Sequence, residues 1–154
     1  MKEDTEKLVE SLKMANVGIS VLELPEPAAR SSDAARLVGC DIHQIAKSIV
    51  FMAEDGSAVL VVANGGDRIN EEAVGRLVGG KVRKAEPSFV EETTGFEIGG
   101  VPPLRTAKIG RVIFDRKLLS YGRIWAACGD PSIVFSTDPR KLVDYDAAEI
   151  ATVS

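Results

Sequence analysis

The sequence predicts a single α+β domain over residues 1–154, with a mixed sheet of about six or seven strands flanked by short helices. The 154 residues suit one ordinary domain with a sizeable core. Segments of helical and strand periodicity alternate at short spacing, with no repeat, low-complexity stretch or linker between them. Hairpin turns and helices both connect the expected strands, which indicates a mixed rather than an all-parallel sheet.

Helices in the first half of the chain are indicated by polar caps and by glycines that follow them. They are expected at residues 4–15, 31–38, 42–46 and 70–78. Ser31-Ser32-Asp33, Asp41 and Asn70 are suited to cap the last three of these helices. Strands are expected at residues 19–24, 48–53, 58–63 and 81–85, with a hairpin turn at residues 54–57.

The second half begins with a helix at residues 87–94, with Pro87 in its first turn and Gly95 at its end. Residues 98–104 hold two glycines and two prolines, which excludes regular structure. Strands are expected at residues 111–115, 124–127 and 132–135, and residues 128–131 are expected to be a loop. Asp138-Pro139 indicates the start of a last helix, and residues 149–153 could add an edge strand.

Charge and hydropathy exclude several classes of protein. A net charge of −4 argues against broad coating of nucleic acid, which needs clustered Lys and Arg, but not against binding one nucleic-acid end in a pocket. No apolar run approaches the roughly 20 residues that span a bilayer. The first residues lack the basic start and apolar core of a signal peptide, so a cytoplasmic location without membrane contact is expected.

The only cysteines are Cys40 and Cys128, and the only histidine is His43. The two cysteines are expected to be free thiols, and the His43 imidazole is expected to be exposed to solvent. Together the three side chains would make at most a poor zinc site. Neither a metal nor a cofactor is therefore expected.

Lys47 is unusual because it lies in the otherwise apolar stretch Ile45-Ala46-Lys47-Ser48-Ile49-Val50-Phe51-Met52. At the mouth of a buried strand, its stem would be buried and its ammonium group would face a cavity, suited to a phosphate, a ribose hydroxyl or a carbonyl oxygen. A lysine whose amino group simply reaches solvent at a strand start remains the alternative.

Two glycine-rich loops could also contribute to a site. In Gly99-Gly100-Val101-Pro102-Pro103, glycines allow close backbone approach to a ligand and prolines stiffen the loop, although it could be only a connection. Gly65-Gly66-Asp67-Arg68 could cradle a phosphate or simply join a strand to a helix. The Cys128-Gly129-Asp130-Pro131 turn could bring Cys128 near a pocket, or leave it as a buried inert thiol.

Several segments, taken in order, resemble the YbaK/EbsC family of editing domains over about residues 25–145. The matching segments are Leu37-Val38-Gly39-Cys40, Ile45-Ala46-Lys47-Ser48-Ile49-Val50-Phe51, Gly65-Gly66-Asp67-Arg68, Thr94-Gly95, Gly99-Gly100-Val101-Pro102-Pro103, Cys128-Gly129 and Asp138-Pro139-Arg140-Lys141-Leu142. The resemblance implies a barrel-like mixed sheet and hydrolysis of the ester between an amino acid and the terminal adenosine of a transfer RNA. Because the family resembles an editing insertion of bacterial prolyl-tRNA synthetase, the expected partners are the 3′ acceptor end of aminoacyl-tRNA and that synthetase.

The resemblance also implies the site residues. Lys47 would position the terminal nucleotide and stabilise developing negative charge, and Gly100 would help to hold the ester carbonyl through backbone N–H groups. Residues implied to contact the substrate are Ser48, Gly99, Val101, Pro102, Cys128, Gly129 and Arg30.

Three departures from cysteinyl-specific relatives make the expected pocket more apolar. Pro102-Pro103 replaces Ser-Pro, Ala127-Cys128-Gly129 replaces Ser-Ala-Gly, and Ile133-Val134 replaces a polar position. The leading hypothesis is a trans-editing deacylase that removes a small amino acid, such as alanine or cysteine, from tRNA-Pro. The alternatives are a non-catalytic module that binds a nucleotide or an aminoacyl-tRNA end, and a regulatory or structural domain.

Overall fold

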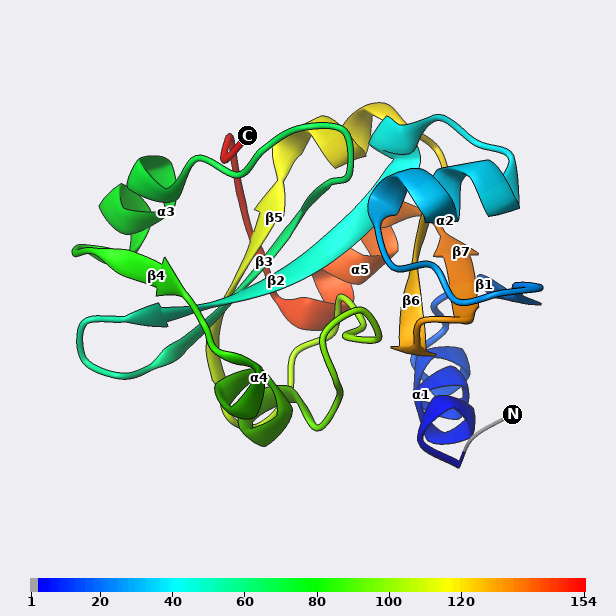
Figure 1. Ribbon diagram of the computed structural model, residues 1–154, viewed down its shortest axis with the longest axis horizontal. Coiled ribbons are helices and arrows are strands. Elements are labelled where there is room, and N and C mark those ends of the chain that lie inside the picture. Colours follow the sequence, from blue (N-terminus) through cyan, green and yellow to red (C-terminus); the bar gives the residue numbers. More distant parts are fainter. Residues whose placement is uncertain (1–2) are drawn as a thin grey trace.

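The computed structural model describes residues 3–154 (Figure 1). Its helices are α1 (Glu3–Met14), α2 (Ser31–Val38), α3 (Glu71–Val78), α4 (Pro87–Thr94) and α5 (Pro139–Asp146), with 3-10 turns η1 (Ile42–Gln44) and η2 (Arg116–Ser120). Its strands are β1 (Ile19–Glu23), β2 (Ile45–Ala53), β3 (Ala58–Asn64), β4 (Val82–Lys84), β5 (Ile109–Asp115), β6 (Ile124–Asp130), β7 (Ile133–Thr137) and β8 (Glu149–Ala151). No helix in residues 3–154 is long and apolar enough to cross a membrane.

The strands form one mixed sheet, which confirms the predicted fold class. Its order is β1-β7-β6-β2-β3-β5-β8, and β4 pairs with β2 outside this path. The pairs β2–β6, β3–β5 and β5–β8 are parallel, and the others are antiparallel. The sheet has eight strands rather than six or seven, because the tail strand β8 adds to β5.

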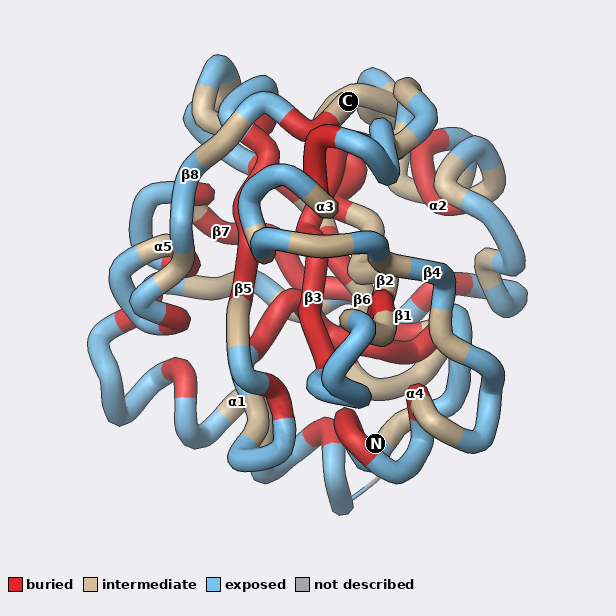
Figure 2. Tube along the Cα trace, turned by 90° about the vertical axis from the view of Figure 1, so that its left-hand side faces the viewer, coloured by how far each residue is buried: buried red, intermediate tan, exposed pale blue. Residues whose placement is uncertain are grey.

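β3 lies inside the sheet between β2 and β5 and is buried along its whole length (Figure 2). Because side chains alternate between the faces of a strand, Leu60 and Val62 join a large core with residues of α1, α4 and α5. Val59 and Val61 join a smaller core on the opposite face, together with Val74 of α3. Apolar burial on both faces explains why residues 58–63 form a continuous apolar run without polar alternation.

The predicted boundaries around β2 are wrong in one respect. Asp41 does cap a short helix, since its carboxylate accepts a hydrogen bond from the His43 N–H at 2.8 Å. However, η1 ends at Gln44, and Ile45 and Ala46 already belong to β2. Their pairing with β6 favours the extended conformation over helix continuation, and this places Lys47 inside the strand rather than before it.

The second error concerns residues 128–131, which were expected to form a loop. β6 continues to Asp130, and its register against β7 shifts between Ala127 and Asp130. Gly129, with φ of 90°, absorbs this bulge, and its N–H donates to the Gly100 carbonyl at 2.9 Å. A strand that bends toward another loop in this way has no local sequence pattern that distinguishes it from a turn.

Candidate functional site

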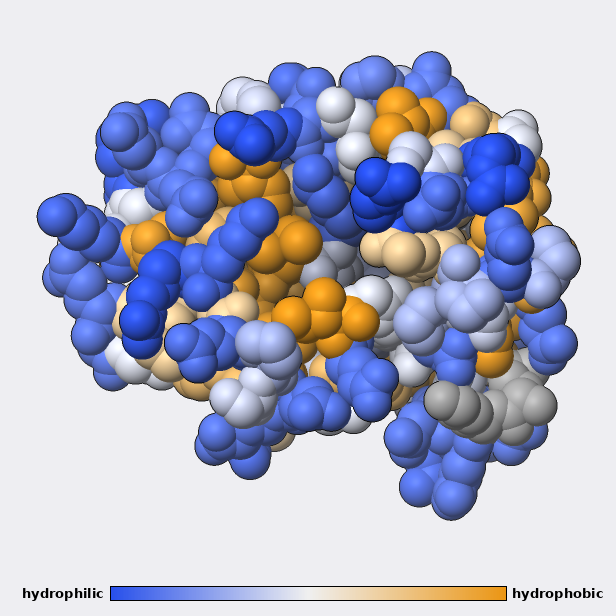
Figure 3. Space-filling model, in the orientation of Figure 1, coloured by the Kyte–Doolittle hydropathy of each residue, from blue (hydrophilic) through white to orange (hydrophobic). Residues whose placement is uncertain are grey.

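A cavity of about 430 Å³, called the apolar cavity below, opens between the start of β2, α2, β6 and the loop after α4. It is lined mostly by apolar residues: Ala28, Ala29, Ala34, Ile42, Ile45, Ala46, Ile49, Ile98, Val101, Trp125, Ala126, Ala127, Pro131 and Val134. Arg30, Ser31, Ser32, Lys47, Ser48, Gly65 and Gly99 complete its lining. Figure 3 shows hydrophobic side chains gathered around a hollow near the middle of this face.

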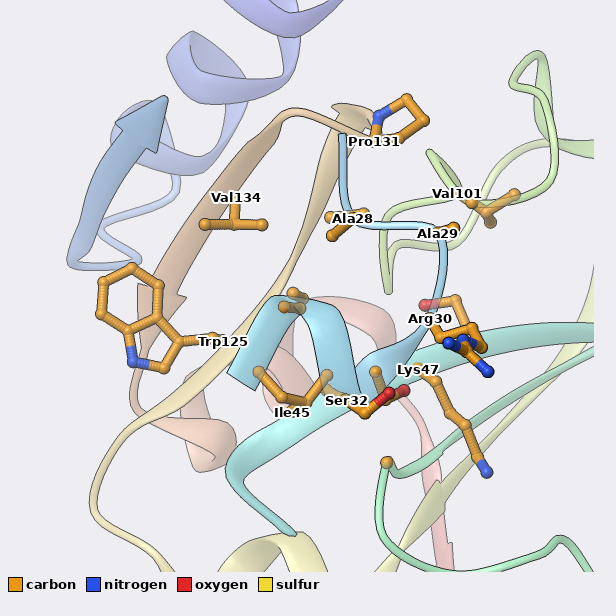
Figure 4. A pocket seen from close by; sticks show the side chains of 18 of the residues that line it. Ala28, Ala29, Arg30, Ser32, Ile45, Lys47, Val101, Trp125, Pro131 and Val134 are labelled. Atoms are coloured by element: carbon orange, nitrogen blue, oxygen red, sulfur yellow. The ribbon is translucent and has the colours of Figure 1, made fainter. Parts of the chain in front are cut away.

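Parallel pairing of β2 with β6 builds one wall of the apolar cavity. It sets Ile45 opposite Trp125 and Ala46 opposite Ala126, although the strands are far apart in sequence. In the close view, Trp125 and Val134 lie on one side of the cavity and Lys47 lies on the other (Figure 4). The cavity therefore has an apolar end and a charged end.

The Lys47 amino group is half-buried at this charged end. Its Nζ donates a hydrogen bond to the main-chain carbonyl of Asp67 at 2.6 Å. Burial lowers the pKa of Lys47, and the positive charge of Lys84 lowers it further, while Asp67 and Asp115 act in the opposite direction. Lys47 is thus a cation held in place by one main-chain acceptor.

Buried polar groups fix the loop that holds Lys47. The Asn64 Oδ1 accepts hydrogen bonds from the N–H groups of Gly66 and Asp67, both at 3.1 Å. Its Nδ2 donates to the Asp115 carboxylate at 2.9 Å, and both Asn64 and Asp115 are fully buried. Because these buried polar groups all have hydrogen-bond partners, they hold the loop rigidly. The Asp67 carbonyl is therefore fixed where it accepts the hydrogen bond from the Lys47 Nζ.

Five of the nine residues expected in the site line the apolar cavity: Lys47, Ser48, Gly99, Val101 and Arg30. Arg30 lies at its edge as the residue that precedes α2, and its side chain is largely exposed. Gly99 is the member of the glycine pair that lines the cavity, and its N–H makes no hydrogen bond with any residue from 3 to 154.

The other four, Gly100, Pro102, Cys128 and Gly129, do not line the apolar cavity. The Gly100 N–H donates to the Glu97 carbonyl at 3.0 Å, and a Cβ on Gly100 would lie 3.0 Å from the Gly129 oxygen. The two glycines therefore let the loop and β6 approach closely. Cys128 is fully buried in the core, and burial raises the pKa of its thiol to about 11.

The Ser48 hydroxyl is the unusual polar group in the cavity. Its Oγ is buried and has no hydrogen-bond partner among residues 3–154. A buried unpaired hydroxyl costs roughly 1–3 kcal/mol, so an unpaired one in a cavity wall suggests a partner supplied by a ligand.

Sequence reasoning placed Ala127 and Val134 at the pocket, and both line the apolar cavity, but it missed other wall residues. Trp125 and Ala28 each come from an unremarkable segment, and only the tertiary arrangement of strands and loops brings them together. Asn64 offered the clearest signal, because it is a polar residue at the end of an apolar strand and directly precedes two glycines. Nowhere in residues 3–154 do three His, Cys, Asp or Glu side chains gather as metal ligands would.

Comparison with known proteins gives one family. The aminoacyl-tRNA editing domain matches residues 25–145. The uncharacterized protein YwhH of Bacillus subtilis (strain 168) is 31% identical over 130 residues, which cover 84% of this chain and 83% of YwhH. Proline–tRNA ligase of Lactobacillus helveticus (strain DPC 4571) is 27% identical over 135 residues, 87% of this chain but 22% of the ligase.

Among solved structures, one described as a candidate trans-editing enzyme for prolyl tRNA synthetase is 35% identical, with a TM-score of 0.91. The match covers 100% of this chain and 98% of that chain. The sheet and helices described above are therefore shared along the whole length of both chains.

Proposed function

Because the chain belongs to the aminoacyl-tRNA editing domain family, we propose that it is a hydrolase that deacylates mischarged transfer RNA. The observation that supports this best is the apolar cavity with the Lys47 amino group at its charged end. An apolar cavity suits a small amino-acid side chain, and a cation beside it suits the ester and the nucleotide.

In the proposed reaction, water attacks the ester carbonyl carbon and the bond to the ribose oxygen breaks. The water oxygen stays on the amino acid, and the ribose oxygen takes up a proton. Negative charge develops on the carbonyl oxygen, where the Lys47 ammonium group and the N–H of Gly99 would stabilise it. The unpaired Ser48 hydroxyl would donate to, or accept from, the aminoacyl group.

The proposed substrate is a small uncharged amino acid, alanine or cysteine, on tRNA-Pro. Alanines form much of the cavity wall, including Ala126 and Ala127, and the lining holds no acidic side chain to pair with a basic substrate. The similarity to proline–tRNA ligases supports tRNA-Pro as the transfer RNA. One methylene more or less changes binding by only about 1–3 kcal/mol, so discrimination between these amino acids should be modest.

We also propose that prolyl-tRNA synthetase is a partner in the cytoplasm. The net charge of −4 gives the chain little general attraction for polyanions. Association with a synthetase would raise the local concentration of transfer RNA without a strong contact to the nucleic acid itself. An unaided affinity for transfer RNA well below micromolar at physiological salt would contradict this proposal.

A panel of charged transfer RNAs tests the activity. Alanyl-, cysteinyl-, seryl- and threonyl-esters on tRNA-Pro, and the same amino acids on their own transfer RNAs, are incubated with the purified protein. Release of alanine or cysteine from tRNA-Pro alone is the expected result. If the protein hydrolyses none of these esters faster than they hydrolyse spontaneously, the proposed deacylase activity is rejected.

A binding module that holds an aminoacyl-tRNA end without hydrolysis is the second candidate. The observation in its favour is that the residues lining the apolar cavity include no histidine or carboxylate that could act as a general base. Calorimetry with a non-hydrolysable amide analogue of aminoacyl-adenosine would show saturable binding in both cases. Only the deacylase would also release amino acid from the ester.

A further inference from the structure

A second cavity, called the polar cavity below, adjoins the apolar cavity. Its volume is about 540 Å³, and Lys47, Ile49 and Gly65 line both cavities. Its other lining residues are Gly66, Asp67, Arg68, Ile69, Glu71 and Lys84. The Lys47 side chain therefore lies where a ligand that occupied both cavities would pass.

Two cationic side chains of the polar cavity have no partner within the part of the chain that the structure describes. The side chains of Arg68 and Lys84 form no hydrogen bond or ion pair with any residue from 3 to 154. Lys84 is close enough to Lys47 to lower its pKa, so two ammonium groups share this space. Two ammonium groups placed together attract an anion.

The acidic groups in the polar cavity do not cancel these charges. The Asp67 carboxylate accepts from the Lys117 Nζ at 3.0 Å and from the Asn64 Nδ2 at 3.2 Å. Glu71 is the other carboxylate in the lining. The lining thus holds three cations, Lys47, Arg68 and Lys84, against two carboxylates, and one of these carboxylates, Asp67, is already paired with Lys117, in a chain whose net charge is −4.

The glycine loop itself is not free to bind an anion. The Gly65 N–H donates to the Ile45 carbonyl at 2.7 Å, and the N–H groups of Gly66 and Asp67 donate to Asn64. An anion in the polar cavity would therefore be held by side chains, as in contacts to a phosphodiester, rather than by a main-chain phosphate loop.

We propose that the polar cavity binds a phosphodiester of the polynucleotide whose aminoacyl ester lies in the apolar cavity, through Arg68 and Lys84. This inference rests on the proposed function and extends it by naming the residues that bind the backbone of the acceptor end. Lys47 lies between the two contacts, so the phosphate contact would set the distance between the ester and the Lys47 amino group.

Deacylation kinetics on mischarged, aminoacylated tRNA-Pro test the site. Arg68→Ala together with Lys84→Ala should raise KM roughly tenfold or more, with a smaller change in kcat, and should reduce the salt dependence of KM. Arg76→Ala together with Lys81→Ala is the matched control, since both residues line a different hollow near α3 and removing them changes net charge equally. Equal KM values for the two double variants would overturn the proposal and leave the deacylase intact.

Direct binding keeps the test independent of catalysis. The dinucleotide CpA, which has one phosphodiester, is titrated into the wild type and both double variants, with inorganic phosphate as a competing probe. CpA binding that weakens roughly tenfold only in the Arg68 and Lys84 variant supports the site even if no ester is hydrolysed. Equal CpA binding by all three proteins, or displacement of CpA by phosphate at equal affinity, would contradict a polynucleotide site.

Discussion

At the scale of single residues, Ser48 and Lys47 are adjacent in β2 but have opposite environments. The Lys47 amino group has a fixed acceptor in the Asp67 carbonyl, whereas the Ser48 hydroxyl is buried without a partner. A buried polar group without a protein partner calls for an explanation, and the proposed contact with the aminoacyl group supplies one for Ser48. The contrast between the two residues allows stability and activity to be separated by mutation.

Ser48→Ala is expected to leave the free energy of unfolding unchanged or to raise it by up to about 1 kcal/mol, because it removes an unpaired buried hydroxyl. Deacylation should fall by roughly tenfold or more, because the substrate loses that partner. Ser48→Thr, which keeps the hydroxyl, is the matched control. Thermal unfolding and kcat measured on the same samples check both expectations, and full activity of Ser48→Ala would remove Ser48 from the site.

The buried carboxyl of Asp146 is expected to make the stability of the folded protein depend on pH. Burial raises the pKa of its carboxyl from an ordinary value of 3.8 to about 7, and one of its oxygens has no partner in residues 3–154. Between these values the folded protein keeps a proton that the unfolded chain has lost, so stability falls as pH rises through this range. Asp41, Asp55, Asp67 and Glu149 have lowered pKa values, so their contributions change only in more acid solution.

Asp146→Asn should therefore flatten the fall in melting temperature between about pH 5 and about pH 8. The amide can keep an acceptor for the Arg105 N–H, which now donates to Asp146 Oδ1 at 2.9 Å. Calorimetric melting at both pH values compares the variant with the wild type. The same pH dependence in both proteins would assign it to other groups.

At the scale of elements, the bulge in β6 shows how local sequence and tertiary contact combine. Gly129 has φ of 90°, and a Cβ there would lie 2.9 Å from the Phe96 ring and 3.2 Å from the Thr5 Oγ1. Gly56, in the hairpin turn between β2 and β3, has φ of 83° but no neighbour within 4 Å. The two positions share the backbone cost of a left-handed residue but differ in crowding.

Gly129→Ala should reduce the free energy of unfolding by about 2–4 kcal/mol, from backbone strain and overpacking together. Gly56→Ala should reduce the free energy of unfolding through backbone strain alone, by about 1–2 kcal/mol. Denaturant unfolding of the two variants measures the difference. Equal losses of stability in the two variants would mean that Phe96 and Thr5 move aside and accommodate the added Cβ at little cost.

Two helix starts were predictable from local signals, whereas α2 begins at Ser31 with Arg30 in the cap position instead of the predicted cap within Ser31-Ser32-Asp33. Asn70 caps α3 through the Ala73 N–H at 3.1 Å, and Asp138 caps α5 through the Arg140 N–H at 2.9 Å, as their sequence positions indicated. The extension of β6 to Asp130 was not predictable, because it depends on the hydrogen bond between Gly129 and Gly100. The start of β2 was also missed, since its pairing with β6 decides the conformation of Ile45.

At the scale of the whole molecule, the sheet order turns separate segments into one site. The sequence indicated Lys47 and the loop at Gly99, and both line the apolar cavity. It did not indicate Trp125, because its position opposite Ile45 depends on a parallel pairing between distant strands. It also suggested that Gly65-Gly66-Asp67-Arg68 could cradle a phosphate, and the structure puts Arg68 and Lys84 at a shared cavity there.

In the proposed reaction, ester hydrolysis at the apolar cavity depends on the Lys47 amino group. Release of alanine or cysteine from mischarged tRNA-Pro is measured with the wild type, Lys47→Ala and Lys47→Met, the last of which keeps an apolar stem of similar length. We predict that both variants melt cooperatively, as the wild type does, and lose deacylation by about a hundredfold or more. Turnover by either variant equal to that of the wild type would contradict the role of Lys47.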